Sequence, residues 1–204
     1  MSTIDNLSQL FTKFPGIGTR QAKRFVYFLL AQDPHFVENL AREISELQKT
    51  ITQCTGCFRF YPRMMSVGTL CSVCVEDADS ATLMVVEKDT DFDSVRRSGS
   101  YAGRYFILGG TIPVLEHDPA SKIRIRELLR RIESGVGEGL SEVILAFSAN
   151  PEGDFTRDYV ARTLEPIAKK HAVIVTTLGR GISTGTELEY SDSDTLRHAL
   201  KNRG

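Results

Sequence analysis

Four cysteines in two close pairs give the sequence its clearest chemical signal. The pairs are Cys54-x-x-Cys57 and Cys71-x-x-Cys74, and residues 58–70 separate them. A CxxC turn directs two thiolates toward one point, so two such turns complete the tetrahedral set that structural Zn²⁺ prefers. Two unrelated pairs, or a redox-active CxxC, are the alternative interpretations. We expect one structural Zn²⁺ per chain, bound by Cys54, Cys57, Cys71 and Cys74.

A glycine-containing turn surrounded by cations is the second signal. The segment 14–18 reads Phe-Pro-Gly-Ile-Gly, and no acidic residue occurs between residues 13 and 32. With Thr19 as the N-cap, the first N–H groups of the next helix are free to bind a DNA phosphate. A plain helical hairpin with a solvated basic face is the alternative. The predicted DNA contacts are Lys13, Gly16, Gly18, Arg20, Lys23 and Arg24.

Carboxylates that follow two apolar runs form the third group. Glu87 follows the run 83–86, and Glu152-Gly153-Asp154 comes shortly after the run 143–146. If both runs are parallel strands, their carboxyl ends lie at one edge of a sheet, where the carboxylates converge and can hold Mg²⁺. Surface caps and salt bridges are the alternative roles. The predicted acidic edge consists of Glu87, Asp91, Glu152 and Asp154.

Other polar residues give weaker signals. The four histidines are scattered and have no paired nucleophile, so no catalytic residue is predicted. We interpret the arginines near 121–133 as the solvated face of a helix, with a DNA-facing stripe as the alternative. They are Arg124, Arg126, Arg130 and Arg131.

Apolar spacing predicts the elements that must position these groups. Intervals of three and four residues predict helices in the N-terminal part, and a 23-residue finger, 54–76, follows that is too short to bury a core without a metal. From residue 80 onward, apolar runs alternate with helical patterns, which predicts a mostly parallel sheet. The predicted strands are 83–86, 105–108, 143–146 and 172–175, and the predicted helices between them are 121–133 and 156–169.

The predicted fold is therefore α+β in several parts. A helical hairpin region is followed by a small four-cysteine zinc finger and an α/β domain with a mostly parallel sheet. The predicted boundaries are 1–53, 54–76, 80–178 and a C-terminal segment, 179–204.

Charge and hydropathy argue against a polycationic, a membrane-spanning or a secreted protein. The net charge is −1, so any binding to nucleic acid must depend on a local basic patch. No run approaches the roughly 18 apolar residues of a membrane span, and the N-terminus lacks the pattern of a signal peptide. We therefore expect a cytoplasmic protein, a compartment in which close cysteine pairs favour metal over disulfides.

The order of these parts resembles the RecR family of bacterial recombination mediators, in which the third part is a Toprim domain. The resemblance covers nearly the whole chain, although the gap between the cysteine pairs is longer than usual, the loop 112–115 differs, and a proline near Ser183 is missing. The matching motifs are 14–18 with Ala22 and Arg24, Val86-Glu87, Tyr101 to Gly110, Ile144-Leu145-Ala146 with Glu152-Gly153 and Thr156, and Gly181, Gly185 and Leu188-Glu189-Tyr190 with Asp192.

The resemblance implies a DNA-binding mediator in DNA repair and not an enzyme. Such a protein binds single- and double-stranded DNA and acts with RecO, and possibly RecF, to help load RecA on single-stranded DNA at gaps. It forms dimers or tetrameric rings and associates with the nucleoid during repair, and its acidic edge contacts partners. The main alternative is a Toprim-type, Mg²⁺-dependent nuclease or primase-like enzyme, for which Glu152-x-Asp154 is only a near match. An RNA-handling zinc protein is a third possibility.

Overall fold

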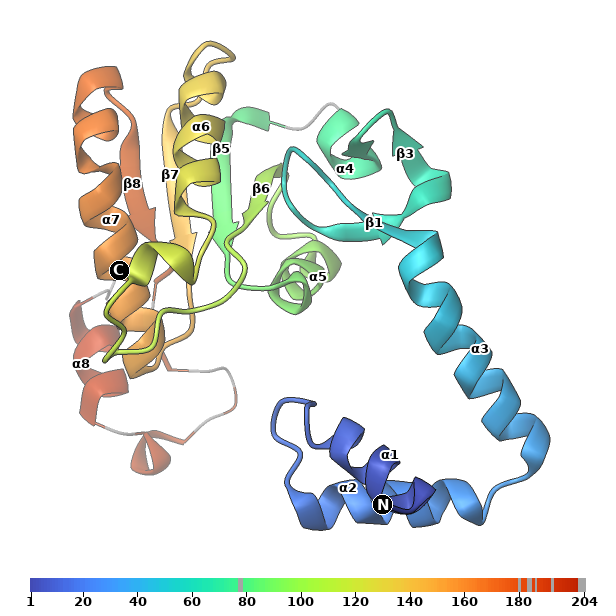
Figure 1. The fold of residues 1–204 in the computed structure, drawn as a ribbon. Helices are drawn as coiled ribbons and strands as arrows, with labels where there is room; N and C mark the ends of the chain where they lie inside the picture. The colour runs from blue at the N-terminus through green and yellow to red at the C-terminus, as the bar shows by residue number, and fades with distance from the viewer. Residues whose placement is uncertain (77–78, 180, 183–184, 186, 192, 202–204) are drawn as a thin grey trace. The chain divides into compact units, whose positions relative to one another are not determined.

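The structure is a computed structural model that describes residues 1–76, 79–179, 181–182, 185, 187–191 and 193–201 (Figure 1). It contains two compact units, Met1–Ile51 and Thr52–Gly204, which we describe separately. Asp192 and Ser183, which were named in the resemblance to the RecR family, lie outside the described residues. The division into four domains stays a prediction.

The first unit consists of three helices, α1 (Thr3–Phe11), α2 (Thr19–Leu30) and α3 (Pro34–Thr50). The side chain of Ser2 caps α1, and Ala22 and Val26 of α2 are buried. The expectation that Thr19 caps α2 was wrong by one residue. Gly18 occupies the cap position with extended backbone and makes no side-chain hydrogen bond.

The finger is built from short elements around the cysteines. Two small sheets pair β1 with β2 and β3 with β4, and the second is antiparallel. The elements are β1 (Ile51–Gln53), β2 (Phe60–Pro62), the 3₁₀ turn Arg63–Met65, β3 (Ser66–Val67), β4 (Leu70–Cys71) and α4 (Ser72–Val75).

A four-stranded parallel sheet forms the centre of the second unit, in the order β6-β5-β7-β8. This confirms the predicted fold class of N-terminal helices, a four-cysteine cluster and a parallel sheet. The strands are β5 (Asp79–Val86), β6 (Gly103–Ile107), β7 (Glu142–Ala146) and β8 (Ile174–Thr177). The helices and 3₁₀ turns are α5 (Asp89–Ser98), Pro119–Ser121, α6 (Ile125–Val136), α7 (Pro151–His171), Leu188–Tyr190 and α8 (Ser193–Lys201).

Local capping explains where the structure differs from the predicted elements. Helix α7 begins five residues earlier than expected because Asn150 Oδ1 accepts a hydrogen bond from Gly153 N at 2.8 Å and Pro151 suits the first helical position. It ends at His171, and the left-handed backbone of the C-cap residue Ala172 (φ 55°) delays β8 until Ile174. Helix α5 was not predicted, since its sequence is mostly polar.

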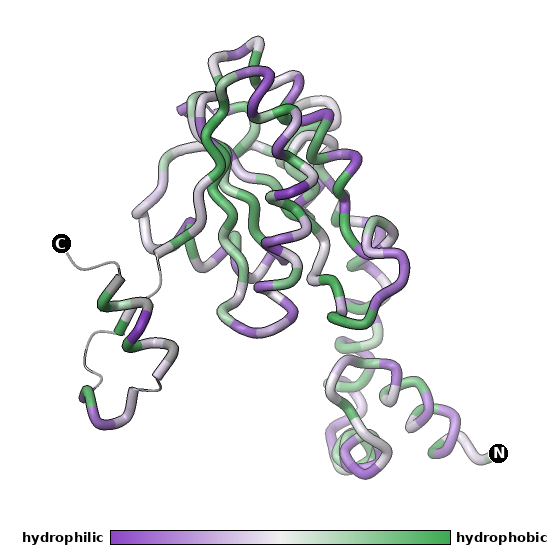
Figure 2. Tube along the Cα trace, turned by 90° about the vertical axis from the view of Figure 1, so that its left-hand side faces the viewer, coloured by the Kyte–Doolittle hydropathy of each residue, from purple (hydrophilic) through white to green (hydrophobic). Residues whose placement is uncertain are grey.

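The two faces of the sheet bury different partners. Successive residues of a strand point to opposite faces, so Leu83 and Val85 pack with α6 and α7, whereas Met84 and Val86 pack with α5 and the cysteines. The strands are correspondingly hydrophobic along much of their length (Figure 2). The finger therefore shares a hydrophobic core with the sheet.

Candidate metal centre and nucleic-acid interface

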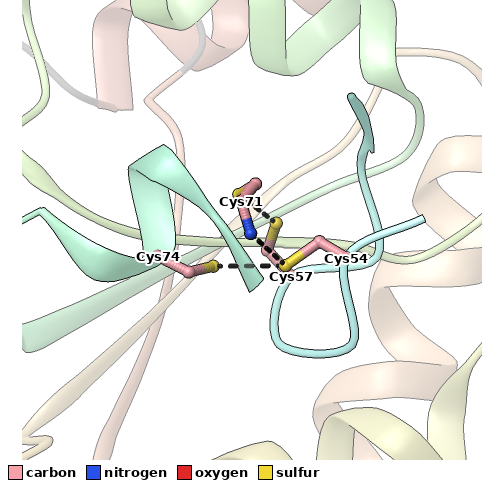
Figure 3. A group of neighbouring side chains, drawn as sticks. All are labelled: Cys54, Cys57, Cys71 and Cys74. Atoms are coloured by element: carbon pink, nitrogen blue, oxygen red, sulfur yellow. Dashed lines mark hydrogen bonds between the residues drawn. The ribbon is translucent and has the colours of Figure 1, made fainter. Parts of the chain in front are cut away.

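The four cysteine side chains converge on one point (Figure 3). The Sγ atoms of Cys54 and Cys74 are 3.7 Å apart, those of Cys57 and Cys71 are 3.6 Å apart, and all four lie within 4.8 Å of one another. A tetrahedron with metal–sulfur bonds of about 2.3 Å has edges of about 3.8 Å, whereas a disulfide brings two sulfurs to about 2 Å. The spacing is that of a four-thiolate metal site.

Backbone groups of the finger support this centre. Cys54 Sγ accepts hydrogen bonds from the N–H groups of Gly56 and Cys71, both at 3.4 Å. Phe58 closes the first CxxC turn, where its N–H bonds Cys54 O at 3.0 Å and its backbone is left-handed at φ 63°. Such donors orient and stabilise thiolate ligands.

The four thiols lie close enough to affect one another's pKa. The hydrogen bond between Cys54 and Cys57 is the largest cause of a lowered pKa at Cys54 and of a raised pKa at Cys57. Negative charges this close repel one another, so all four ionise together only when a cation lies between them. These residues can therefore hold a metal ion.

The first CxxC turn is attached to the edge of the sheet. Cys57 O accepts a hydrogen bond from Ile107 N of β6 at 2.8 Å, and Asp89 Oδ1 accepts one from Phe60 N at 2.8 Å. The Arg59 guanidinium lies 4.5 Å from the centre of the Phe92 ring. The cysteine cluster is thereby joined to β6 and α5.

The predicted DNA contacts lie on and beside the turn that precedes α2. Gly16 has φ +78°, and a Cβ there would meet nothing within 4 Å, so glycine is required by the backbone and not by crowding. Because Gly18 offers no capping side chain, the N–H groups of the first turn of α2 remain available. All the predicted cations are exposed: Lys13, Arg20, Lys23 and Arg24.

Two of the predicted acidic residues have local partners near the end of β5. Glu87 is only 3% exposed, and its carboxylate accepts hydrogen bonds from Ser148 N at 2.6 Å and Ser148 Oγ at 3.0 Å. Asp91 Oδ2 accepts a hydrogen bond from Lys88 N at 3.0 Å and caps the start of α5.

The other two lie in the first turn of α7. Glu152 Oε2 accepts a hydrogen bond from Thr111 Oγ1 at 3.2 Å, and Asp154 Oδ1 pairs with Arg157 Nη1 at 2.7 Å. Within the described part of the chain, the four cysteines form the only group of three or more potential ligands that lie close enough together to hold a metal. Among the described residues, the predicted carboxylates form no such group, and their role at the acidic edge stays a prediction.

Two residues beside the acidic edge have structural roles that the sequence did not assign. A Cβ on Gly153 would lie 2.0 Å from Ser148 O, so only glycine allows this close approach. The buried Thr156 Oγ1 accepts a hydrogen bond from Ile112 N at 2.8 Å and donates one to Glu152 O at 2.7 Å. Both residues belong to the sequence motif at 152–156, and this motif was the only indication of their importance that the sequence offered.

No helix within the described residues combines the length and apolar character needed to cross a bilayer.

Comparisons with known proteins agree along the chain. The Toprim domain family matches residues 81–178, the RecR helix-hairpin-helix family matches residues 4–47, and the RecR C-terminal family matches residues 181–203. Recombination protein RecR of Chlorobium chlorochromatii is 36% identical over 202 residues, which is 98% of this chain and 95% of the relative. The RecR proteins of Bacteroides thetaiotaomicron and Treponema denticola are 38% and 35% identical, covering 95% and 100% of this chain and 89% and 98% of their own lengths. This chain belongs to the RecR family.

Proposed function

We propose that this protein is a DNA-binding recombination mediator in DNA repair. The observation that carries the proposal is the exposed basic turn before α2, in a chain whose relatives are named recombination protein RecR. Its cations and unpaired helix N–H groups suit phosphates and present nothing that reads a base, so we expect binding without sequence preference to single- and double-stranded DNA.

Charge reversal at this turn tests DNA binding. We expect Arg20→Glu with Lys23→Glu to weaken binding at least tenfold for every DNA sequence and to reduce the salt dependence, because contacts to phosphates are lost. The matched control is Arg42→Glu with Lys49→Glu, which makes the same change of charge on α3. Fluorescence anisotropy over a salt series measures both. Equal affinity of the test variant and the parent protein would refute this site.

We infer that the metal is Zn²⁺, one per chain. The sulfur spacing supports this assignment, because Zn²⁺ favours four thiolates in a tetrahedron. A closed set of four thiolates supplies folding energy and leaves no position for substrate, so the role of the metal is structural.

We propose that the mediator acts as a homo-oligomer, a dimer or a tetrameric ring. Helix α3 supports this proposal because none of its residues is buried within the chain. Leu40, Ile44 and Leu47 are 38%, 62% and 60% exposed and lie at helical spacing on one side. A contiguous apolar face of this kind is typical of an interaction surface. The mass in solution, with and without DNA, tests the assembly.

We propose RecO, and possibly RecF, as protein partners. Together these proteins would help to load RecA on single-stranded DNA at gaps. This would take place in the cytoplasm, at the nucleoid. Glu87, Asp91, Glu152 and Asp154 are the proposed partner-binding residues. Since Glu152 is exposed and Glu87 is buried, we expect Glu152→Gln to act on partner affinity directly and Glu87→Gln to act by loosening Ser148.

We further propose that the protein is not an enzyme. The alternative Toprim-type enzyme needs carboxylates that share Mg²⁺, and the described carboxylates are instead bound to separate local partners. Incubation of plasmid and single-stranded DNA with Mg²⁺ or Mn²⁺ should give no cleavage and no primer synthesis. Cleavage by the parent protein that disappears in Glu87→Gln would establish the enzyme instead.

A further inference from the structure

A groove runs between the finger and helix α6. It consists of a hollow of about 620 Å³ and a neighbouring hollow of about 240 Å³, and Phe58 and Glu127 line both. We call these two adjoining hollows the knuckle groove. Its volume is within the range of about 300–1,000 Å³ that is usual for ligand sites.

The knuckle groove is basic although the chain as a whole is not. Its cationic lining residues outnumber its two carboxylates, Glu127 and Glu138, by three, whereas the net charge of the chain is −1. A cleft of one sign with low-dielectric walls concentrates the opposite charge, so the ligand is expected to be an anion. The cationic residues are Arg104, Lys122, Arg124, Arg130 and Arg131.

Internal pairing leaves much of this positive charge available. Arg104 and Arg131 share the single carboxylate of Glu138, and the hydrogen bond from Arg104 is the largest cause of the lowered pKa of Glu138. Lys122 pairs with Glu116 at 3.1 Å. Arg130 is exposed, and its side chain has no hydrogen bond or ion pair among the residues that the structure describes.

An aromatic wall accompanies these cations. The Phe58 ring packs against the buried Phe106 at 5.4 Å, and the Arg124 guanidinium lies 5.5 Å from the Phe58 ring centre. Arg124 is itself held by a hydrogen bond from its Nη1 to Ile107 O at 3.1 Å. The wall is therefore fixed by the edge of the sheet before any ligand arrives.

Cations beside an aromatic wall are the combination that binds unpaired nucleotides, with phosphates on the guanidinium groups and bases against the ring. We propose that the knuckle groove binds single-stranded DNA, as a second contact apart from the turn before α2. This inference rests on the proposed function and adds the place where the unpaired strand lies. A duplex keeps its bases paired and cannot use the Phe58 wall.

The test compares two arginines of α6 in the full-length, zinc-containing protein. Arg130 lines the groove, whereas Arg126 is exposed on the same helix and lines neither hollow. Affinity for oligo(dT) is measured by fluorescence anisotropy over a salt series. We expect Arg130→Glu to bind about tenfold more weakly, because a charged hydrogen bond to a phosphate is lost, with a smaller salt slope by about one. Arg126→Glu should change affinity less than twofold.

Ultraviolet cross-linking of oligo(dT) to the parent protein gives an independent measurement. Cross-links mapped to Phe58 support the groove, and cross-links confined to residues 13–24 overturn it. Equal losses in both arginine variants also overturn it, because they indicate general electrostatics. If neither variant changes affinity while Arg20→Glu with Lys23→Glu does, DNA binding stands and the groove proposal fails. If Arg130→Glu weakens only the binding of a partner protein, the occupant is a protein and the proposal is wrong.

Discussion

Thr156→Val removes a buried hydrogen bond that joins α7 to the loop after β6, together with the hydrogen bond within α7 from Thr156 Oγ1 to Glu152 O. Thr156 is fully buried, and its hydroxyl is the acceptor for the backbone N–H of Ile112 at 2.8 Å. Valine has nearly the same shape but no acceptor. Ile112 is also fully buried, so its N–H would lose its partner without gaining water.

The expected cost follows from that unpaired N–H group. Leaving a buried donor unsatisfied costs about 1–3 kcal/mol, while the packing contribution stays small because the volume is conserved. For a protein of this size, each kcal/mol corresponds to a fall in Tm of roughly 2–4 °C. We therefore expect the free energy of unfolding of the second unit to fall by about 1–3 kcal/mol.

Urea unfolding and amide hydrogen exchange measure this effect together. Thr163→Val is the matched control, because Thr163 Oγ1 donates to Tyr159 O at 2.8 Å on the same helix and accepts no hydrogen bond from a distant N–H of the described residues. Removal of the Thr163 hydroxyl should lower the free energy of unfolding by less than about 0.5 kcal/mol, as for an ordinary helix substitution. The Ile112 amide should exchange faster only in Thr156→Val. Equal stability of the two variants, with the Ile112 amide still protected, would refute this assignment.

Three other outcomes test the metal, the acidic edge and the pH response. Cys71→Ser should lower the metal content from about one Zn²⁺ per chain, measured by elemental analysis, and should unfold the finger; full occupancy would contradict the four-thiolate site. Gly153→Ala should destabilise the second unit in urea by more than about 1 kcal/mol, because the new Cβ overlaps Ser148 O; an unchanged midpoint would show that the loop adapts. Burial raises the pKa of Tyr101 from 10.0 to about 12, so this phenol ionises first in the unfolded chain. The stability that neutral Tyr101 gives the folded state is therefore fully present below pH 10 and is lost as the pH rises toward 12. Unfolding measured between pH 9 and 12 should show this loss in the parent protein, and a similar loss in Tyr101→Phe would assign it elsewhere.

Much of the second unit was predictable from the sequence because the apolar runs of β5 and β6 are buried on both faces and that of β7 is largely covered. A strand of this kind reads as an uninterrupted apolar run, which is why the cores of β5, β6 and β7 were placed correctly. The four-cysteine cluster was equally predictable, because a CxxC turn fixes its geometry locally.

Tertiary contacts explain what the sequence could not supply. Phe92 is the buried residue of α5. One buried apolar position gives too little periodicity for a helix to be recognised in the sequence. The carboxylates were expected to meet because two strands end at one edge, but Ser148 and Arg157 hold Glu87 and Asp154 separately. Neither partner is implied by the motifs themselves.

A metal ion held by the four cysteines would also stabilise the sheet, because Ile107 N of β6 donates a hydrogen bond to Cys57 O. A ligand that binds only the folded state adds about 1.4 kcal/mol to the free energy of unfolding for every tenfold rise in its free concentration above Kd. Since the finger and the sheet share one hydrophobic core, that increment applies to the whole second unit and not to the finger alone. The stability of the sheet would therefore depend on the concentration of free metal.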